Sequence, residues 1–105
     1  MLPVLSVPGK NVHFVVTMHD VDGSAGLRRA FGPAHREYAA TIRDRIVLAG
    51  PIYADDGVTS NGSVFVVNFE TPAEVADFIA ADPFVISGVY RDWTVVLFKN
   101  IWTQD

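Results

Sequence analysis

Four stretches of the chain have the hydrophobic pattern of β-strands. Residues 11–19 alternate with a period of two, which predicts a strand with Val12, Phe14, Val16 and Met18 on one face and His13, Val15, Thr17 and His19 on the other. The stretches 46–53, 63–70 and 89–98 are rich in Val, Ile and aromatic residues. In the last two, alternation sets Val64 and Val66 against Phe65, Val67 and Phe69, and Trp93, Val95 and Leu97 against Tyr90, Val96 and Phe98.

Two helical regions lie between these strands. The pattern predicts a short helix over 24–31 and, after an interruption at Gly32-Pro33, a second segment over 33–44, because proline suits the first position of a helix. Residues 71–74, Thr-Pro-Ala-Glu, form a capping box with proline at the first helical position. The helix that they start is expected to end at about Asp82, where the next proline stops it.

The elements follow in the order β-α-β-β-α-β, which predicts an α+β, ferredoxin-like fold with a four-stranded antiparallel sheet. Two helices cover only one face of such a sheet, yet its strands are apolar on both faces. A second copy of the chain is the simplest partner for the other face, so we expect a homodimer or a higher homo-oligomer. Gly50-Pro51 marks a sheet edge or a bulge, because proline cannot donate to the ladder.

Composition limits the class of protein. The 105 residues correspond to one domain, which we place at 12–105 after an extended N-terminal arm over 1–11. Half of the residues are apolar and the net charge is −4, which argues against a nucleic-acid partner. The absence of cysteine excludes thiolate chemistry and cysteine zinc ligands, and it favours a cytoplasmic protein. No stretch has the pattern of a membrane span or a signal peptide, so no membrane partner is expected.

Two residues are candidates for acid–base chemistry. His35 lies in the first turn of the helix predicted over 33–44, where the partial positive charge favours the neutral imidazole that a general base needs. Asp82 lies at a helix C-terminus among apolar neighbours, where a carboxylate needs a partner such as an imidazole. The alternatives are a core-edge histidine with one hydrogen bond and, for Asp82, a helix stop, since Asp-Pro commonly starts a turn.

Residues on the predicted strands supply candidates for the walls of a pocket. Ser63 could offer a hydroxyl to a ligand, but no Gly-x-Ser-x-Gly sequence surrounds it, so it is a poor candidate for a nucleophile. Gly50 and Pro51 could form a backbone turn beside the pocket. Tyr90 could donate a hydrogen bond, although an aromatic residue of the sheet or an interface is the simpler interpretation.

The remaining basic residues give weaker signals. Arg28 and Arg29 could attract an anionic substrate, but a solvated helix face explains them better. His13 and His19 lie about 20 Å apart on one strand, at roughly 3.3 Å per residue, so they cannot bind the same metal ion. No metal site is therefore expected.

An ordered set of short motifs resembles the YciI-like (YCII-related) family over about residues 12–99. The motifs are Gly-Pro-Ala-His at 32–35, Leu-Ala-Gly-Pro-Ile at 48–52, Gly-Ser at 62–63, Asp-Pro-Phe at 82–84 and Gly-Val-Tyr at 88–90. The resemblance implies a ferredoxin-like chain that dimerises into an α+β barrel, with an active-site histidine at His35 and an aspartate at Asp82. Similar proteins include a dehydrochlorinase of a chlorinated hydroxyquinol. The fold is shared with muconolactone isomerases and some cofactor-free monooxygenases.

These observations predict an isomerase or lyase that needs no metal or organic cofactor. His35 would move a proton on a small cyclic or aromatic oxygenated substrate, and Asp82 would orient the imidazole, while Ser63 and Tyr90 would donate hydrogen bonds. The alternative is a non-catalytic dimer that binds a metabolite or has a regulatory role. Side-chain atoms of His35 and Asp82 within about 3.2 Å would favour catalysis over binding. A sealed pocket would favour a purely structural dimer.

Overall fold

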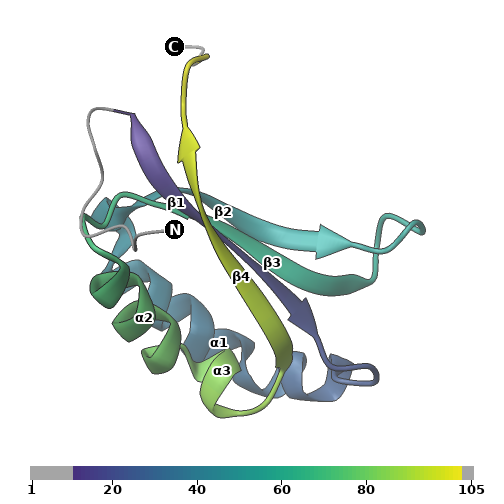
Figure 1. The fold of residues 1–105 in the computed structure, drawn as a ribbon. Coiled ribbons are helices and arrows are strands. Elements are labelled where there is room, and N and C mark those ends of the chain that lie inside the picture. Colours follow the sequence, from purple (N-terminus) through teal and green to yellow (C-terminus); the bar gives the residue numbers. More distant parts are fainter. Residues whose placement is uncertain (1–10, 103–105) are drawn as a thin grey trace.

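The computed structural model describes residues 11–102 and confirms the predicted α+β fold (Figure 1). The elements are β1 (Val12–Asp20), α1 (Ala25–Thr41), a 3₁₀ turn η1 (Arg43–Arg45), β2 (Ile46–Tyr53), β3 (Ser60–Val67), α2 (Pro72–Ala81), α3 (Pro83–Ile86) and β4 (Tyr90–Lys99). The antiparallel sheet has the order β2-β3-β1-β4, and all three α-helices lie on one of its faces. The arm predicted over 1–11 lies, except for Asn11, outside the described residues.

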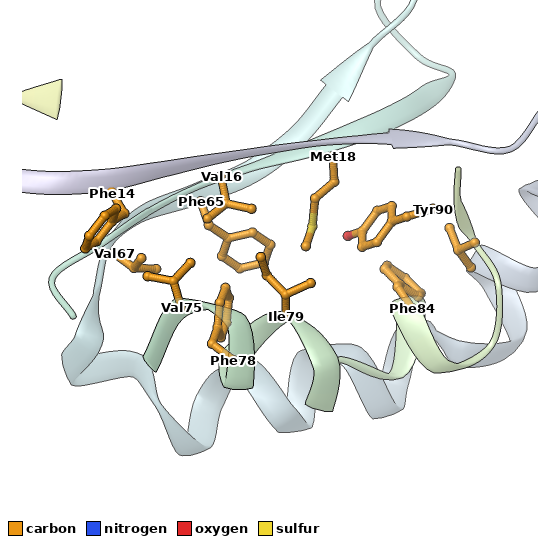
Figure 2. Close-up of a cluster of buried hydrophobic side chains, with 11 residues drawn as sticks. Phe14, Val16, Met18, Phe65, Val67, Val75, Phe78, Ile79, Phe84 and Tyr90 are labelled. Atoms are coloured by element: carbon orange, nitrogen blue, oxygen red, sulfur yellow. The ribbon is translucent and has the colours of Figure 1, made fainter. Parts of the chain in front are cut away.

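The core lies between the helices and the sheet, as Figure 2 shows. The face of β1 that was predicted to be apolar supplies Phe14, Val16 and Met18, all of which are buried. The remaining side chains of the buried cluster come from β3, the two shorter helices, the residue before β4 and the start of β4, namely Phe65, Val67, Val75, Phe78, Ile79, Phe84, Val89 and Tyr90. The capping box at 71–74 is confirmed, with the Glu74 N–H donating to Thr71 Oγ1 and the Thr71 N–H donating to Glu74 Oε1.

Helix α1 is continuous, so the predicted interruption at Gly32-Pro33 is wrong. Pro33 lies inside the 17-residue helix, although proline has no N–H and its ring crowds the carbonyl four residues earlier. Side chains on both sides of Pro33 hold the helix against the rest of the molecule: Arg28 contacts β1 and β3, and Tyr38 donates to the carbonyl of Phe78 on α2. Tertiary contacts therefore outweigh the local preference of proline. Such contacts commonly decide helix stability in proteins. The helix ends at Thr41, before the predicted Asp44.

A register shift at the start of β4 reverses the expected orientation of Tyr90. Strict alternation places Tyr90 on the face of Val96 and Phe98. In the structure His19 pairs with Asp92, but the next residue of β1, Asp20, pairs with Tyr90. The extra residue in β4 is a β-bulge, which turns Tyr90 toward the helices, where it is 6% exposed. Val96 and Phe98 stay on the face opposite the described helices.

Strand β2 forms one edge of the sheet, which is the first of the two alternatives predicted for Gly50-Pro51. The register irregularities of β2 lie at its two ends, between Ile46 and Leu48 and between Ile52 and Tyr53. An edge strand tolerates proline, because a backbone N–H on its outer side would have no neighbouring strand to bind.

The face of the sheet opposite the helices is rich in apolar side chains. Leu48 on β2 and Val96 on β4 are more than half exposed, and Phe98 is 44% exposed. The partners of Val15 across the sheet, Val66 and Val96, belong to the same face. In residues 11–102, no helix has the length and hydrophobicity that are needed to cross a membrane.

We expect Phe78→Ala to lower the free energy of unfolding by about 3–5 kcal/mol, because the cavity that it leaves is not refilled. The Phe78 ring contacts Phe65 edge-on and also packs on Tyr38 and Phe69, so it joins α1, α2 and β3. Urea denaturation measures the change. Val58→Ala, at a side chain that is 78% exposed, is the control and should stay within about 0.5 kcal/mol of the wild type. Similar losses for the two variants would contradict this description of the core.

Candidate functional site

His35 and Asp82 form a hydrogen-bonded pair in the structure. Nδ1 of His35 lies 2.8 Å from Oδ1 of Asp82, although the residues are 47 positions apart in the sequence. The Asp82 side chain is fully buried, and the His35 side chain is 15% exposed. The separation is within the 3.2 Å that we expected to favour catalysis over mere binding.

The chain holds Asp82 in place through the junction of two helices. Asp82 is the C-cap of α2 and also the N-cap of α3, where the Phe84 N–H donates to Oδ1 over 2.9 Å. Pro83 occupies the first position of α3, where its missing N–H costs nothing. The sequence pattern had placed this carboxylate only at the unfavourable C-terminal end of a helix. The backbone N–H of α3 compensates, so the helix stop and the ionisable partner of His35 are the same residue.

Aromatic rings fix the plane of the His35 imidazole. The Phe84 ring is stacked on it, with centroids 4.0 Å apart and an interplanar angle of 11°, and Phe65 contacts it edge-on at 5.9 Å. With Asp82 accepting from the Nδ1–H, the neutral ring has its lone pair on Nε2. None of the hydrogen bonds among the described residues uses Nε2, and His35 lines an open cleft. A proton acceptor is therefore available to a molecule in that cleft.

A second polar network lies beside this pair and is centred on Arg28. Its Nε donates to Asp20 Oδ2 over 2.5 Å, and its Nη2 donates to the carbonyl of Gly62 over 2.8 Å and to Ser63 Oγ over 3.0 Å. The Arg28 side chain is only 16% exposed. The preferred interpretation of Arg28 as part of a solvated helix face is therefore wrong. Asp20 was not among the candidates, because nothing local in the sequence links the end of a strand to a helix eight residues later.

The hydroxyl groups of Tyr90 and Ser63, both predicted for the site, are joined by a hydrogen bond. Tyr90 donates to Ser63 Oγ over 2.9 Å, and Ser63 also accepts from Arg28. A hydroxyl accepts two hydrogen bonds and donates one, so these contacts leave the Ser63 proton for another acceptor. Ser63 lines the cleft, whereas Tyr90 lies behind it. Any contribution of Tyr90 to ligand binding would therefore be made through Ser63.

The cleft lies between α1 and the β2–β3 hairpin and has a volume of about 1050 Å³. It is open, so the feature that would favour a purely structural dimer is not present at this site. Gly50 and Pro51 line it, as predicted, opposite His35 and Arg28. Gly62 has room for no side chain, since a Cβ there would lie 2.3 Å from the Met18 carbonyl oxygen. This close approach of β3 to β1 brings the Gly62 carbonyl within reach of Arg28.

The tip of the β2–β3 hairpin supplies the outer rim of the cleft through Val58, Thr59 and Ser60. Asp56 organises this turn, accepting from the Thr59 hydroxyl and from the backbone N–H groups of Thr59 and Val58. These hydrogen bonds, with that of the Thr59 hydroxyl first, lower the pKa of Asp56 to about 2. The rim therefore keeps its shape at any pH at which Asp56 is ionised.

The other two histidines lie away from the cleft, on the face of the sheet opposite the described helices. His19 contacts Asp92 of β4, with Nδ1 and Oδ1 2.7 Å apart, and His13 is opposite Phe98. The neighbouring Arg91, and then His19, lower the pKa of Asp92. Across residues 11–102, no group of three or more His, Cys, Asp or Glu residues is arranged to hold a metal ion.

The fold and the site together define a ferredoxin-like α+β chain, with the subunit fold of the dimeric α+β barrel proteins, that carries a buried His–Asp pair at one wall of a cleft. The sequence matches the YCII-related domain over residues 12–99. The chain therefore belongs to the YCII-related family, as its motifs had indicated.

Three relatives illustrate the extent of the similarity. The chain is 30% identical over 96 residues to Protein YciI of Escherichia coli O6:H1, covering 85% of this chain and 98% of that protein. It is 29% identical over 98 residues to an uncharacterized protein of Haemophilus influenzae, covering 87% of this chain and 100% of the relative. Among solved structures, it resembles the 5-chloro-2-hydroxyhydroquinone dehydrochlorinase TftG from Burkholderia phenoliruptrix AC1100, in complex with 2,5-dihydroxybenzoquinone. That match has a TM-score of 0.75 and 27% identity, and it covers 83% of this chain and 93% of TftG.

Tyr90 should make the protein sensitive to alkaline pH. Burial raises the pKa of its hydroxyl above the ordinary 10.0. Above about pH 10, the unfolded chain releases this proton while the folded chain retains it, so the free energy of unfolding falls as the pH rises. We expect Tyr90→Phe to make this fall shallower between about pH 9 and 11, measured by urea denaturation.

Val89→Ala serves as the control for this experiment. It weakens the same part of the core without removing a titrating group, because Val89 is fully buried next to Tyr90. Its pH slope should match that of the wild type. If Tyr90→Phe also keeps the wild-type slope, the conclusion that burial keeps the Tyr90 hydroxyl protonated is wrong.

Proposed function

We propose that the protein is an enzyme that transfers a proton on a small cyclic or aromatic oxygenated substrate without a metal or an organic cofactor. The observation that carries the proposal is the 2.8 Å contact of His35 Nδ1 with the buried Asp82, at the wall of an open cleft. The similarity to TftG, a dehydrochlorinase solved with a dihydroxybenzoquinone, supports a substrate of this kind.

In this proposal His35 is the general base. Nε2 takes a proton from a carbon next to a carbonyl group or from a ring hydroxyl, and the Asp82 carboxylate stabilises the imidazolium that results. The electron pair that is released moves toward the substrate oxygen, where the Ser63 hydroxyl donates its own hydrogen bond. A positioned base of this type contributes about 10²–10⁴-fold to a rate.

Two outcomes of such a step belong to the same class. In an isomerisation, His35 returns the proton to another atom of the substrate. In an elimination, the electron pair forms a new double bond, chloride leaves with the pair of its bond to carbon, and the imidazolium later gives its proton to water. Loss of a proton and a chloride balances as loss of HCl. The cleft geometry is compatible with both, because both begin with abstraction by Nε2.

The test is turnover by the wild type and by His35→Ala. We expect the wild type to release chloride from 5-chloro-2-hydroxyhydroquinone, or to isomerise a lactone in a panel that is followed by ultraviolet absorbance. His35→Ala should lose about 10²–10⁴-fold in kcat. His19→Ala, which removes a histidine from the other face of the sheet, is the matched control and should keep the wild-type kcat.

The variant Asp82→Asn distinguishes a role of Asp82 in the proton transfer from a role in substrate binding. It keeps the shape of the side chain and its hydrogen bond from Phe84, but it removes the charge that stabilises the imidazolium. We expect kcat to fall by about tenfold or more while KM changes little. Full turnover by His35→Ala would disprove the assignment of the base. Tight binding of ring compounds with no turnover of any of them would favour the alternative of a metabolite-binding dimer.

We also propose that the active species is a homodimer, formed by packing of two sheets through the face that the helices leave uncovered. Val15, Leu48, Val64, Val96 and Phe98 would form the contact. An apolar face of this extent supports association, because such surface gains free energy when it is removed from water. The fold shared with the dimeric α+β barrel proteins supports the same arrangement.

Sedimentation velocity at micromolar concentration tests this assembly. We expect a dimer for the wild type and a monomer for Val96→Glu, because a carboxylate buried between two sheets without a partner is costly. Leu27→Glu, at an exposed position of α1, is the control and should remain dimeric. A wild type that sediments as a monomer would refute the proposal.

A further inference from the structure

The described side chains that line the cleft beside His35 carry several positive charges and no negative one. Arg28, Arg29 and Arg36 line it, together with His35, and no Asp or Glu of the described residues is among the lining side chains. The chain as a whole has a net charge of −4. A cleft that is basic on an acidic protein concentrates anions, because low-dielectric walls focus the field of the charges that line it.

Two of these arginines form no ion pair with an Asp or Glu of residues 11–102. Arg28 is bonded to Asp20 through both Nε and Nη2, so its charge is largely balanced inside the protein. Arg29 and Arg36 take part in none of the ion pairs formed within residues 11–102. The two are seven residues apart on α1, which is about two turns or 10 Å along the helix axis. They therefore lie on the same side of the helix, at the edge of the cleft.

Gly32 shapes the position of the Arg36 side chain. A Cβ added at Gly32 would lie 3.2 Å from Nη1 of Arg36, which shows that the guanidinium group lies back over the glycine. Gly32 also lines the cleft and is buried, although it is flanked by exposed residues. The guanidinium group of Arg36 therefore lies next to Gly32, about one helical turn before Arg36 itself. This position keeps it at the cleft, which His35 also lines.

From this arrangement we propose that the substrate is an anion, a small ring that carries a carboxylate or an ionised phenol. Arg36 and Arg29 would bind its charged oxygen atoms at the mouth of the cleft, and its ring would lie toward His35 and Phe84. A guanidinium group matches the two oxygens of a carboxylate with paired N–H groups. The inference rests on the proposed function for the chemistry at His35, but the charge preference belongs to the cleft itself.

Binding of benzoate and benzamide to the whole protein tests the inference without any need for turnover. The two probes have nearly the same shape and differ in charge, and ¹⁵N-resolved NMR titration measures even weak binding and shows where it occurs. We expect benzoate to bind in the cleft at least about threefold more tightly than benzamide, and to weaken as salt is added. Arg36→Gln and Arg29→Gln should each weaken benzoate about three- to tenfold and leave benzamide unchanged.

Arg43→Gln is the matched control, because it removes the same charge from η1, outside the cleft. It should leave benzoate binding at the wild-type level. Equal affinity for the two probes, no binding of benzoate, shifts that map outside the cleft, or an equal loss in Arg43→Gln would each overturn the inference. His35→Ala should still prefer benzoate over benzamide, so a failure of the proposed catalytic role and a failure of the anion site give different results.

Discussion

The contact between the Asp82 carboxylate and the His35 ring is the interaction on which the rest of the site depends. One oxygen of this fully buried carboxylate accepts from the backbone N–H of Phe84 and also faces Nδ1 of the imidazole. It thereby joins α1 to the junction of α2 and α3, and the Phe84 ring next to it stacks on the imidazole. A buried carboxylate without such partners would be costly, so the same contact that orients the His35 ring also makes the fold tolerate Asp82.

Helix α1 is fixed at two places, one on each side of Pro33. Arg28 anchors its first half to Asp20 at the end of β1 and to Gly62 and Ser63 on β3. Seven residues later, His35 anchors it to Asp82. The two anchors hold both halves of the helix against the same layer, which explains why it continues through a proline. Both residues also line the cleft, so the geometry of the cleft and the continuity of the helix have a common cause.

The two faces of the sheet have different roles. The face toward the helices holds the core and, at its edge, the cleft with Ser63. The opposite face keeps large apolar side chains exposed in the single chain, where association with a second copy would bury them. The bulge at the start of β4 contributes to the first of these roles, because it moves Tyr90 from the outer face to a position behind Ser63. One added residue in β4 thus places the Tyr90 hydroxyl on the helix side of the sheet and not on the opposite side.

Much of the fold and part of the site follow from the sequence by itself. Period-two alternation and the capping box at 71–74 determine the strands and α2, since backbone geometry ties side-chain direction to spacing along the chain. The positions of His35 and Asp82 at predicted helix ends singled out these two residues, and the family motifs gave the same pair. Only the tertiary structure decided that α1 passes through Pro33, that Tyr90 turns inward, and that Arg28 binds Asp20 rather than water. These features depend on contacts between residues far apart in the sequence or on a shift of strand register, and local pattern carries no information about either.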